Sequence, residues 1–188
     1  GIHSTTQVNW GIKKLEVALA LDNTGSMSSA GKMTNLKTAS KNLISILKNA
    51  AKKAGDVKIA IVPFEVVVKI GNSYKDEFWI NYSKNSIAKN SWEGCLEDRD
   101  RSPGSINYNT KDTAPVSGTT NTYFPAIQCG SLVSMMPLTD VFDPSGFNSL
   151  NTKVDSMTPS GNTNTTIGLV WAWHTLTQNL PFPQGAAT

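Results

Sequence analysis

Apolar residues along the first third of the chain form two short unbroken runs separated by one long helical pattern. Residues 17–21 are uniformly apolar, which is typical of a strand covered on both faces of a sheet. From residue 32 to 54, apolar residues recur at helical spacing with lysines on the opposite face, and Gly55 is a natural stop for this helix. Residues 57–62 predict a second buried strand. The order strand, helix, strand predicts the beginning of a doubly wound, Rossmann-like α/β sheet flanked by helices.

The pattern continues with shorter elements. Pro63 and Phe64 interrupt the second strand, and residues 65–70 predict a third strand. We expect it to pair antiparallel, because the connection is too short for a parallel crossover. The later elements expected from their apolar spacing and capping residues are a strand at 132–138, a helix at 144–157 with Asp143 as its N-cap, and a helix at 164–177. Residues 1–13 are interpreted as a loose lead-in and residues 184–188 as a tail.

Residues 71–131 break this pattern. They are rich in Asn, Ser, Thr, Gly and Tyr and show no sustained periodicity. So long an irregular stretch is unusual inside a compact domain and indicates an insertion within a single domain that spans residues 1–188. Its scattered aromatic side chains, Trp79 and Trp92 among them, either pack the insertion onto the domain or form a surface for a protein or glycan partner.

Composition narrows the function only a little. The chain has 188 residues, a net charge of +3 and 16% charged residues. Its lysines are spread along helices and do not cluster with aromatic residues, so the charge does not indicate nucleic-acid binding. No run of about 18 apolar residues is present, so we expect no membrane span. The chain begins at Gly1 without Met, from which we expect a processed or engineered end and an upstream targeting segment that has been removed.

The two cysteines, Cys95 and Cys129, both lie in the irregular stretch. An even count in a loop-rich segment is consistent with one disulfide and an oxidising compartment. The alternative is two unrelated thiols.

A carboxylate and two hydroxyls follow the first strand on alternate residues: Asp22, Thr24 and Ser26. Gly25 allows the backbone to turn tightly between them. These groups, placed where a parallel strand meets its helix, make an all-oxygen site suited to a hard divalent cation. The alternative is an ordinary helix-capping loop, since Asp, Ser and Thr are favoured at helix starts.

The segment Asp22-Asn23-Thr24-Gly25-Ser26 resembles the D-x-[ST]-x-S signature of von Willebrand factor A (vWA) domains, the first segment of their metal-ion-dependent adhesion site (MIDAS). Residues 161–169 are similar to the family's second metal loop, in which Thr163 matches the ligand threonine. More narrowly, the chain resembles the vWA region of TadG-like proteins of bacterial Flp/Tad pilus assembly. The further stretches that carry this resemblance are Val57-Lys58-Ile59-Ala60-Ile61-Val62-Pro63-Phe64, Trp92-Glu93-Gly94-Cys95-Leu96-Glu97-Asp98-Arg99, Pro137-Leu138-Thr139 and Gly168-Leu169-Val170-Trp171-Ala172-Trp173.

The resemblance implies a metal site that holds Mg²⁺, or Mn²⁺ or Ca²⁺. It implies that Thr24 and Ser26 bind the metal through their hydroxyls, that Asp22 acts through a water, and that Thr163 joins directly or through water. A partner protein would complete the shell with an Asp or Glu carboxylate. The family's further metal-site Asp and the final strands of its sheet are expected after the last helix and are missing from this chain. We interpret Asp140, which follows Thr139, as a loop residue and not as that ligand.

These features predict a non-catalytic, metal-dependent adhesion module of a bacterial envelope protein in Flp/Tad pilus assembly. It would be anchored by a segment outside this chain, and the open edge of its first strand would allow self-association. The alternative is a structural scaffold of the same apparatus with an idle metal site. An Asp-dependent phosphotransferase is disfavoured, because its second Asp would fall at Thr24. The two histidines, His3 and His174, form no catalytic constellation, and no Cys/His cluster indicates zinc.

Overall fold

The computed structural model describes residues 14–99, 112–183 and 185, and β2 (Val57–Phe64) is the strand around which the others are arranged. β1 (Leu15–Asp22) pairs with β2 in parallel along its whole length. β7 (Met136–Asp140) pairs antiparallel with the other edge of β2, and β3 (Val68–Lys69) turns back antiparallel from its end. The sheet is therefore mixed and not uniformly parallel.

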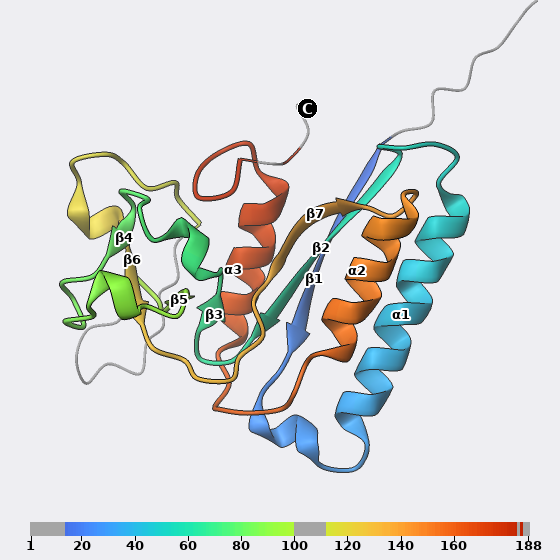
Figure 1. Cartoon of the computed structure of the whole chain (residues 1–188), viewed down its shortest axis with the longest axis horizontal. Helices are drawn as coiled ribbons and strands as arrows, with labels where there is room; N and C mark the ends of the chain where they lie inside the picture. The colour runs from blue at the N-terminus through green and yellow to red at the C-terminus, as the bar shows by residue number, and fades with distance from the viewer. Residues whose placement is uncertain (1–13, 100–111, 184, 186–188) are drawn as a thin grey trace, which may run out of the picture.

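Helices cover both faces of this sheet (Figure 1). α1 (Lys32–Ala50) and α2 (Pro144–Asp155) lie on one face, and α3 (Thr165–Leu176) lies on the other. Successive side chains of a strand point to opposite faces, so β2 contributes to two cores. Ile59 and Ile61 pack with residues of α1 and α2, while Phe64 packs with residues of α3. The expected α/β class, a sheet flanked by helices, is confirmed.

The predicted helix starts are confirmed more closely than the predicted ends. Asp143 caps α2 by accepting the Ser145 N–H (2.8 Å), and Asn164 caps α3. α1 ends four residues before the predicted residue 54. The reason is the Asp56 carboxylate, which accepts the N–H groups of Lys52 and Lys53 and closes a turn there.

The prediction that Pro63 and Phe64 interrupt the second strand was wrong, because β2 runs through both residues. Phe64 directs its carbonyl oxygen to the Asn23 N–H (3.0 Å) at the end of β1. Backbone groups of successive residues point to opposite edges of a strand, so Pro63 faces the β7 side. Pairing with β7 has already ended at Ile61, and the missing proline N–H therefore breaks no ladder bond. The third strand has the predicted orientation but covers only Val68 and Lys69.

The insertion is not separate from the sheet. β5 (Cys95–Leu96) pairs with β3 and with β6 (Phe124–Ile127), and β6 pairs with β4 (Ile80–Asn81). Single-turn 3₁₀ helices occupy Gly25–Ser28 in the first loop and Asn72–Tyr74, Lys89–Ser91 and Thr120–Thr122 in the insertion.

Aromatic packing joins the insertion to the rest of the domain. Trp79 and Trp92 are buried, and the ring of Phe124 lies 4.9 Å from that of Trp171 in α3. The disulfide Cys95–Cys129 is present and links the start of β5 to the segment after β6. Of the two interpretations of these aromatic residues, packing onto the domain is the one observed for Trp79 and Trp92.

The first strand is less buried than its apolar sequence predicts. Only Leu21 of residues 17–21 is buried, and Ala20 is exposed. Among the described residues β1 pairs with β2 alone, so its second edge carries no strand there. Val17 and Leu19 nevertheless pack against the core that contains α1 and α2, and Ala18 packs against the core that contains α3. The predicted coverage on both faces is therefore confirmed, and so is the open edge among the described residues.

The strand predicted at 132–138 is shifted toward the C-terminus, to Met136–Asp140. Asp140 is therefore the last strand residue and not a loop residue. Its carboxylate accepts the Gly55 N–H (2.6 Å) and the Phe142 N–H (2.9 Å), and these bonds fix the chain as it leaves the strand.

Some sequence predictions lie outside the described residues, namely the lead-in at 1–13 with His3 and tail residues 184 and 186–188. Within the described part of the chain, no helix has the length and hydrophobicity needed to cross a membrane.

Candidate functional site

The candidate site lies at the edge of the sheet where the parallel strands β1 and β2 both end. Asp22 is the last residue of β1, and it lies beside Phe64, the last residue of β2. Ligand sites of α/β sheets form outside the carboxyl ends of parallel strands, where loops from neighbouring strands meet. This edge is where the sequence motif was expected to act.

The first loop gathers its oxygen atoms closely. The Asp22 carboxylate accepts the Thr24 N–H (2.9 Å), and the Thr24 and Ser26 hydroxyl oxygens lie 3.2 Å apart. Thr24 is buried, whereas Ser26 is exposed. Neither Thr24 nor Gly31, the residues that precede the 3₁₀ turn and α1, caps its helix with a side chain. The helix-capping alternative therefore does not explain the two hydroxyls.

The second loop is hydrogen-bonded directly to the first. The Gly25 N–H donates to the Gly161 carbonyl (2.9 Å), and the Ser160 N–H donates to the Asn23 carbonyl (2.9 Å). The Asn23 side-chain amide adds a bond to the Thr158 carbonyl (2.8 Å). Segments far apart in sequence are thus held side by side, as the motif assignment requires.

Thr163 is exposed and lies in the second loop, directly before the α3 cap Asn164. The bonds at Thr158, Ser160 and Gly161 tie its loop to the 22–26 turn. The structure therefore places Asp22 at the end of β1 and the other three expected ligand residues on these two adjoining loops.

Glu65 is a residue of this site that the sequence analysis missed. Its side chain is buried, and its carboxylate accepts the Ser160 hydroxyl and the Asn23 amide (3.4 Å). Its backbone carbonyl also accepts the Asn164 N–H (3.1 Å). Glu65 is thereby bonded to both loops. In the sequence, Glu65 could have been noticed as a charged residue directly after a buried strand. That strand is parallel to the one that ends in Asp22.

The insertion also reaches this edge. The Asn164 amide nitrogen donates to the Asp98 carboxylate (2.6 Å), while the Asn164 side-chain oxygen accepts N–H groups of the first turn of α3. Asp98 lies shortly after β5 and is itself buried. The insertion therefore helps to fix the residue next to Thr163.

The oxygen arrangement of the first loop fits a small divalent cation. Mg²⁺ binds oxygen ligands at about 2.0–2.1 Å in octahedral geometry, so adjacent ligand oxygens lie about 2.9 Å apart. The 3.2 Å between the Thr24 and Ser26 oxygens is close to this spacing. No group of three or more His, Cys, Asp or Glu that could hold a metal occurs among the described residues. The fit thus depends on hydroxyls together with one carboxylate, that of Asp22.

Asp140 does not belong to this site. It pairs with Lys58 at the start of β2, six positions before Phe64. At about 3.3 Å per strand residue, this places Asp140 roughly 20 Å from the edge where Asp22 lies.

His174 is part of the core. It is buried on α3, with its ring edge-to-face against Phe124 (5.6 Å) and Trp171 (5.4 Å). Burial, together with the nearby charge of Arg99, lowers the pKa of His174 to about 4. Its Nε2 has no hydrogen-bond partner among the described residues.

Comparison with models of known protein families finds no match, and comparison with curated proteins finds none either. Comparison with solved structures finds two matches, both of the pilus adhesin SpaC from Lactobacillus rhamnosus GG, one of them in an open conformation. Their sequence identities to this chain are 15% and 14%, each with a TM-score of 0.47. The matches cover 91% and 92% of this chain but only 14% of the SpaC chain.

Proposed function

We propose that this chain is a metal-dependent protein-binding module, a MIDAS-type vWA domain of a TadG-like bacterial envelope protein in Flp/Tad pilus assembly. Asp22, Thr24, Ser26 and Thr163 hold a divalent cation, Mg²⁺ or its substitutes Mn²⁺ and Ca²⁺. The partner is a protein that offers an Asp or Glu carboxylate.

The observation that carries this proposal is the pair of loops bonded to each other at the carboxyl edge of β1 and β2. The motif resemblance alone concerns residues at either end of the chain. The bond from the Gly25 N–H to the Gly161 carbonyl (2.9 Å) supports treating them as parts of one site. The spacing of the Thr24 and Ser26 oxygens, which suits adjacent ligands of one cation, supports the metal dependence.

The proposed ligands differ in the charge that they bring to the site. A bound divalent cation would supply the coordination position that takes a partner's carboxylate oxygen. Thr24 and Ser26 contribute neutral hydroxyls, so among the proposed ligands only Asp22 brings a negative charge. A site with so little charge favours an external carboxylate as its next ligand.

The disulfide Cys95–Cys129 supports an oxidising location such as the periplasm or the cell surface. Within the described structure, the proposed location rests on this disulfide alone.

The proposal is tested by titrating the chain with Mn²⁺ and following binding by calorimetry. We expect saturable binding by the native chain and at least a tenfold loss in Asp22→Ala. Asp143→Ala is the control, because Asp143 caps α2 and lies outside both loops; it should bind Mn²⁺ as the native chain does. Equal binding by Asp22→Ala and the native chain would reject the metal-dependent function and leave the scaffold alternative.

A further inference from the structure

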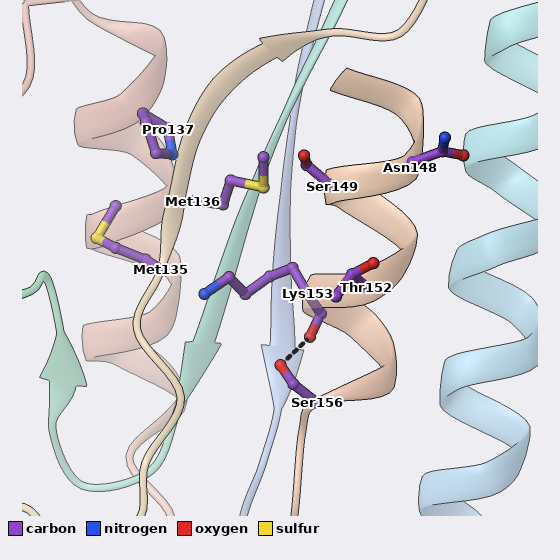
Figure 2. Close-up of a pocket in the computed structure, with 8 residues that line it drawn as sticks. All are labelled: Met135, Met136, Pro137, Asn148, Ser149, Thr152, Lys153 and Ser156. Atoms are coloured by element: carbon purple, nitrogen blue, oxygen red, sulfur yellow. Dashed lines mark hydrogen bonds between the residues drawn. The ribbon is translucent and has the colours of Figure 1, made fainter. Parts of the chain in front are cut away.

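A groove of about 420 Å³ runs between β7 and α2, away from the two loops of the candidate metal site. Met135, Met136 and Pro137 line it from the β7 side, where only the Met136 side chain is directed toward α2, and polar residues of α2 line the other side (Figure 2). Its volume falls within the range of about 300–1,000 Å³ that is usual for ligand pockets. The groove thus combines one apolar side chain, that of Met136, with a polar wall from α2.

Lys153 crosses this groove from α2 toward β7, as Figure 2 shows. Its ammonium donates to the Ser134 hydroxyl (3.1 Å), which uses one of its three N–H donors. Asp155, the nearest acidic residue in sequence, is paired instead with Lys41 of α1 (2.7 Å). Among the described residues Lys153 has no ion-pair partner. A half-buried cation therefore faces the groove without a counter-charge.

This situation is energetically unfavourable for the cation. Burial lowers the pKa of Lys153 below its ordinary value, because the charged form loses water contacts. A carboxylate brought into the groove would supply the missing counter-charge and accept the remaining ammonium N–H groups.

The occupant is not held as an added strand. Among the described residues β7 pairs only with β2, so its outer edge carries no strand there. However, Pro137 has no N–H, and its carbonyl oxygen accepts the Thr139 hydroxyl (2.8 Å). A proline on an edge strand disfavours strand addition. Side chains of the occupant must provide the contacts.

We propose that the groove between β7 and α2 binds an acidic peptide segment of a partner protein, with an Asp or Glu carboxylate on Lys153 and an adjacent apolar side chain on Met136. Charge complementarity identifies the carboxylate, and the side chain of Met136, flexible and polarisable, suits apolar side chains of varied shape. The groove is open along two elements, which suits a peptide better than a small enclosed ligand. The site is independent of the metal loops.

The test is a selection of peptides from a randomised displayed library against the native chain, Lys153→Met and Lys75→Met. EDTA is present throughout, so that carboxylate capture by a loop-bound metal cannot contribute. Lys75→Met is the control, because it removes the same charge from an exposed lysine of the insertion. We expect the native chain and the control to enrich peptides with an Asp or Glu beside an apolar residue, and Lys153→Met to enrich them at least tenfold less.

A second measurement needs no protein variant. The strongest enriched peptide is compared with its amide counterpart, Asn for Asp or Gln for Glu, while the methyl signal of Met136 is followed by NMR. The acidic peptide should shift this signal and bind at least tenfold more tightly. The proposal is overturned by a selection without acidic enrichment, by equal enrichment on Lys153→Met, or by equal affinity of the amide peptide. It is also overturned if free glutarate shifts the Met136 signal as strongly at the same concentration.

Discussion

The backbone N–H of Gly25 donates a 2.9 Å hydrogen bond to the carbonyl oxygen of Gly161. This bond joins the loop after the first strand to the loop before the last helix. Because it uses backbone atoms, it fixes the relative position of the loops without using the side chains of Thr24, Ser26 or Thr163. The Thr24 and Ser26 hydroxyls instead lie within hydrogen-bond distance of each other, 3.2 Å apart.

Glu65 should prove important for keeping the two loops together. Glu65→Ala removes the acceptor of the half-buried Ser160 hydroxyl and of one of the two hydrogen bonds made by the buried Asn23 amide. We expect the free energy of unfolding to fall by about 2–3 kcal/mol, measured by urea denaturation. Glu77→Ala is the control; Glu77 is exposed, so its removal should change stability by less than about 0.5 kcal/mol.

Gly161→Ala should disturb the same contact from the other side. Gly161 has φ +67°, and an added Cβ would collide with the carboxylate of Glu65. Gly31→Ala is a matched control, because Gly31 has φ +69° but open space around it. Both variants should lose about 1 kcal/mol to backbone strain, and Gly161→Ala should lose at least about 1 kcal/mol more. Equal losses in thermal or urea unfolding would show that Glu65 does not occupy this position in solution.

The buried His174 should make stability depend on pH. Its pKa is about 4 in the folded chain and about 6.5 in an unfolded one, so the unfolded chain binds the extra proton first. Stability is complete above about pH 6.5 and falls as the pH drops from 6.5 to 4, by about 3 kcal/mol in total.

The variant His174→Phe should remove this part of the pH dependence while keeping an aromatic ring against Phe124 and Trp171. The measurement is the difference in unfolding free energy between the native chain and the variant from pH 4 to 7. A constant difference over that range would contradict a buried neutral histidine.

The disulfide Cys95–Cys129 should contribute substantially to stability. It closes a loop with a sequence separation of 34 residues, for which chain entropy predicts about 3–4 kcal/mol. Cys95→Ser/Cys129→Ser should unfold at correspondingly lower urea concentration than the oxidised native chain. Non-reducing mass spectrometry provides the check on the native chain, because two free thiols would contradict the pairing.

The sequence identified the elements whose signals are local. Helical spacing, together with the Asp143 cap of α2, located α2 and α3 to within one or two residues, because capping and amphipathic spacing act within a few residues. The same local reasoning selected Asp22, Thr24 and Ser26 at a strand end. The same reasoning placed the end of α1 too late in the chain. The turn there depends on the Asp56 carboxylate as an acceptor, which periodicity does not reveal.

The pairing of strands could not be predicted from such local signals. The apolar pattern of β1 was the same whether one or two strands flank it, and the tertiary structure decided that one edge is unpaired among the described residues. β7 begins at Met136 and not near residue 132, since its register is set by β2.

The sequence by itself determined the class of fold, the positions of the helices and the choice of oxygen-bearing residues for the proposed metal site, since each depends on neighbours along the chain. Only the tertiary structure decided that Glu65 joins the two loops, that Asp140 lies at the far end of the sheet, and that Lys153 faces a groove without a counter-charge. These relationships depend on which strands lie side by side, and that choice is made by long-range packing of buried side chains.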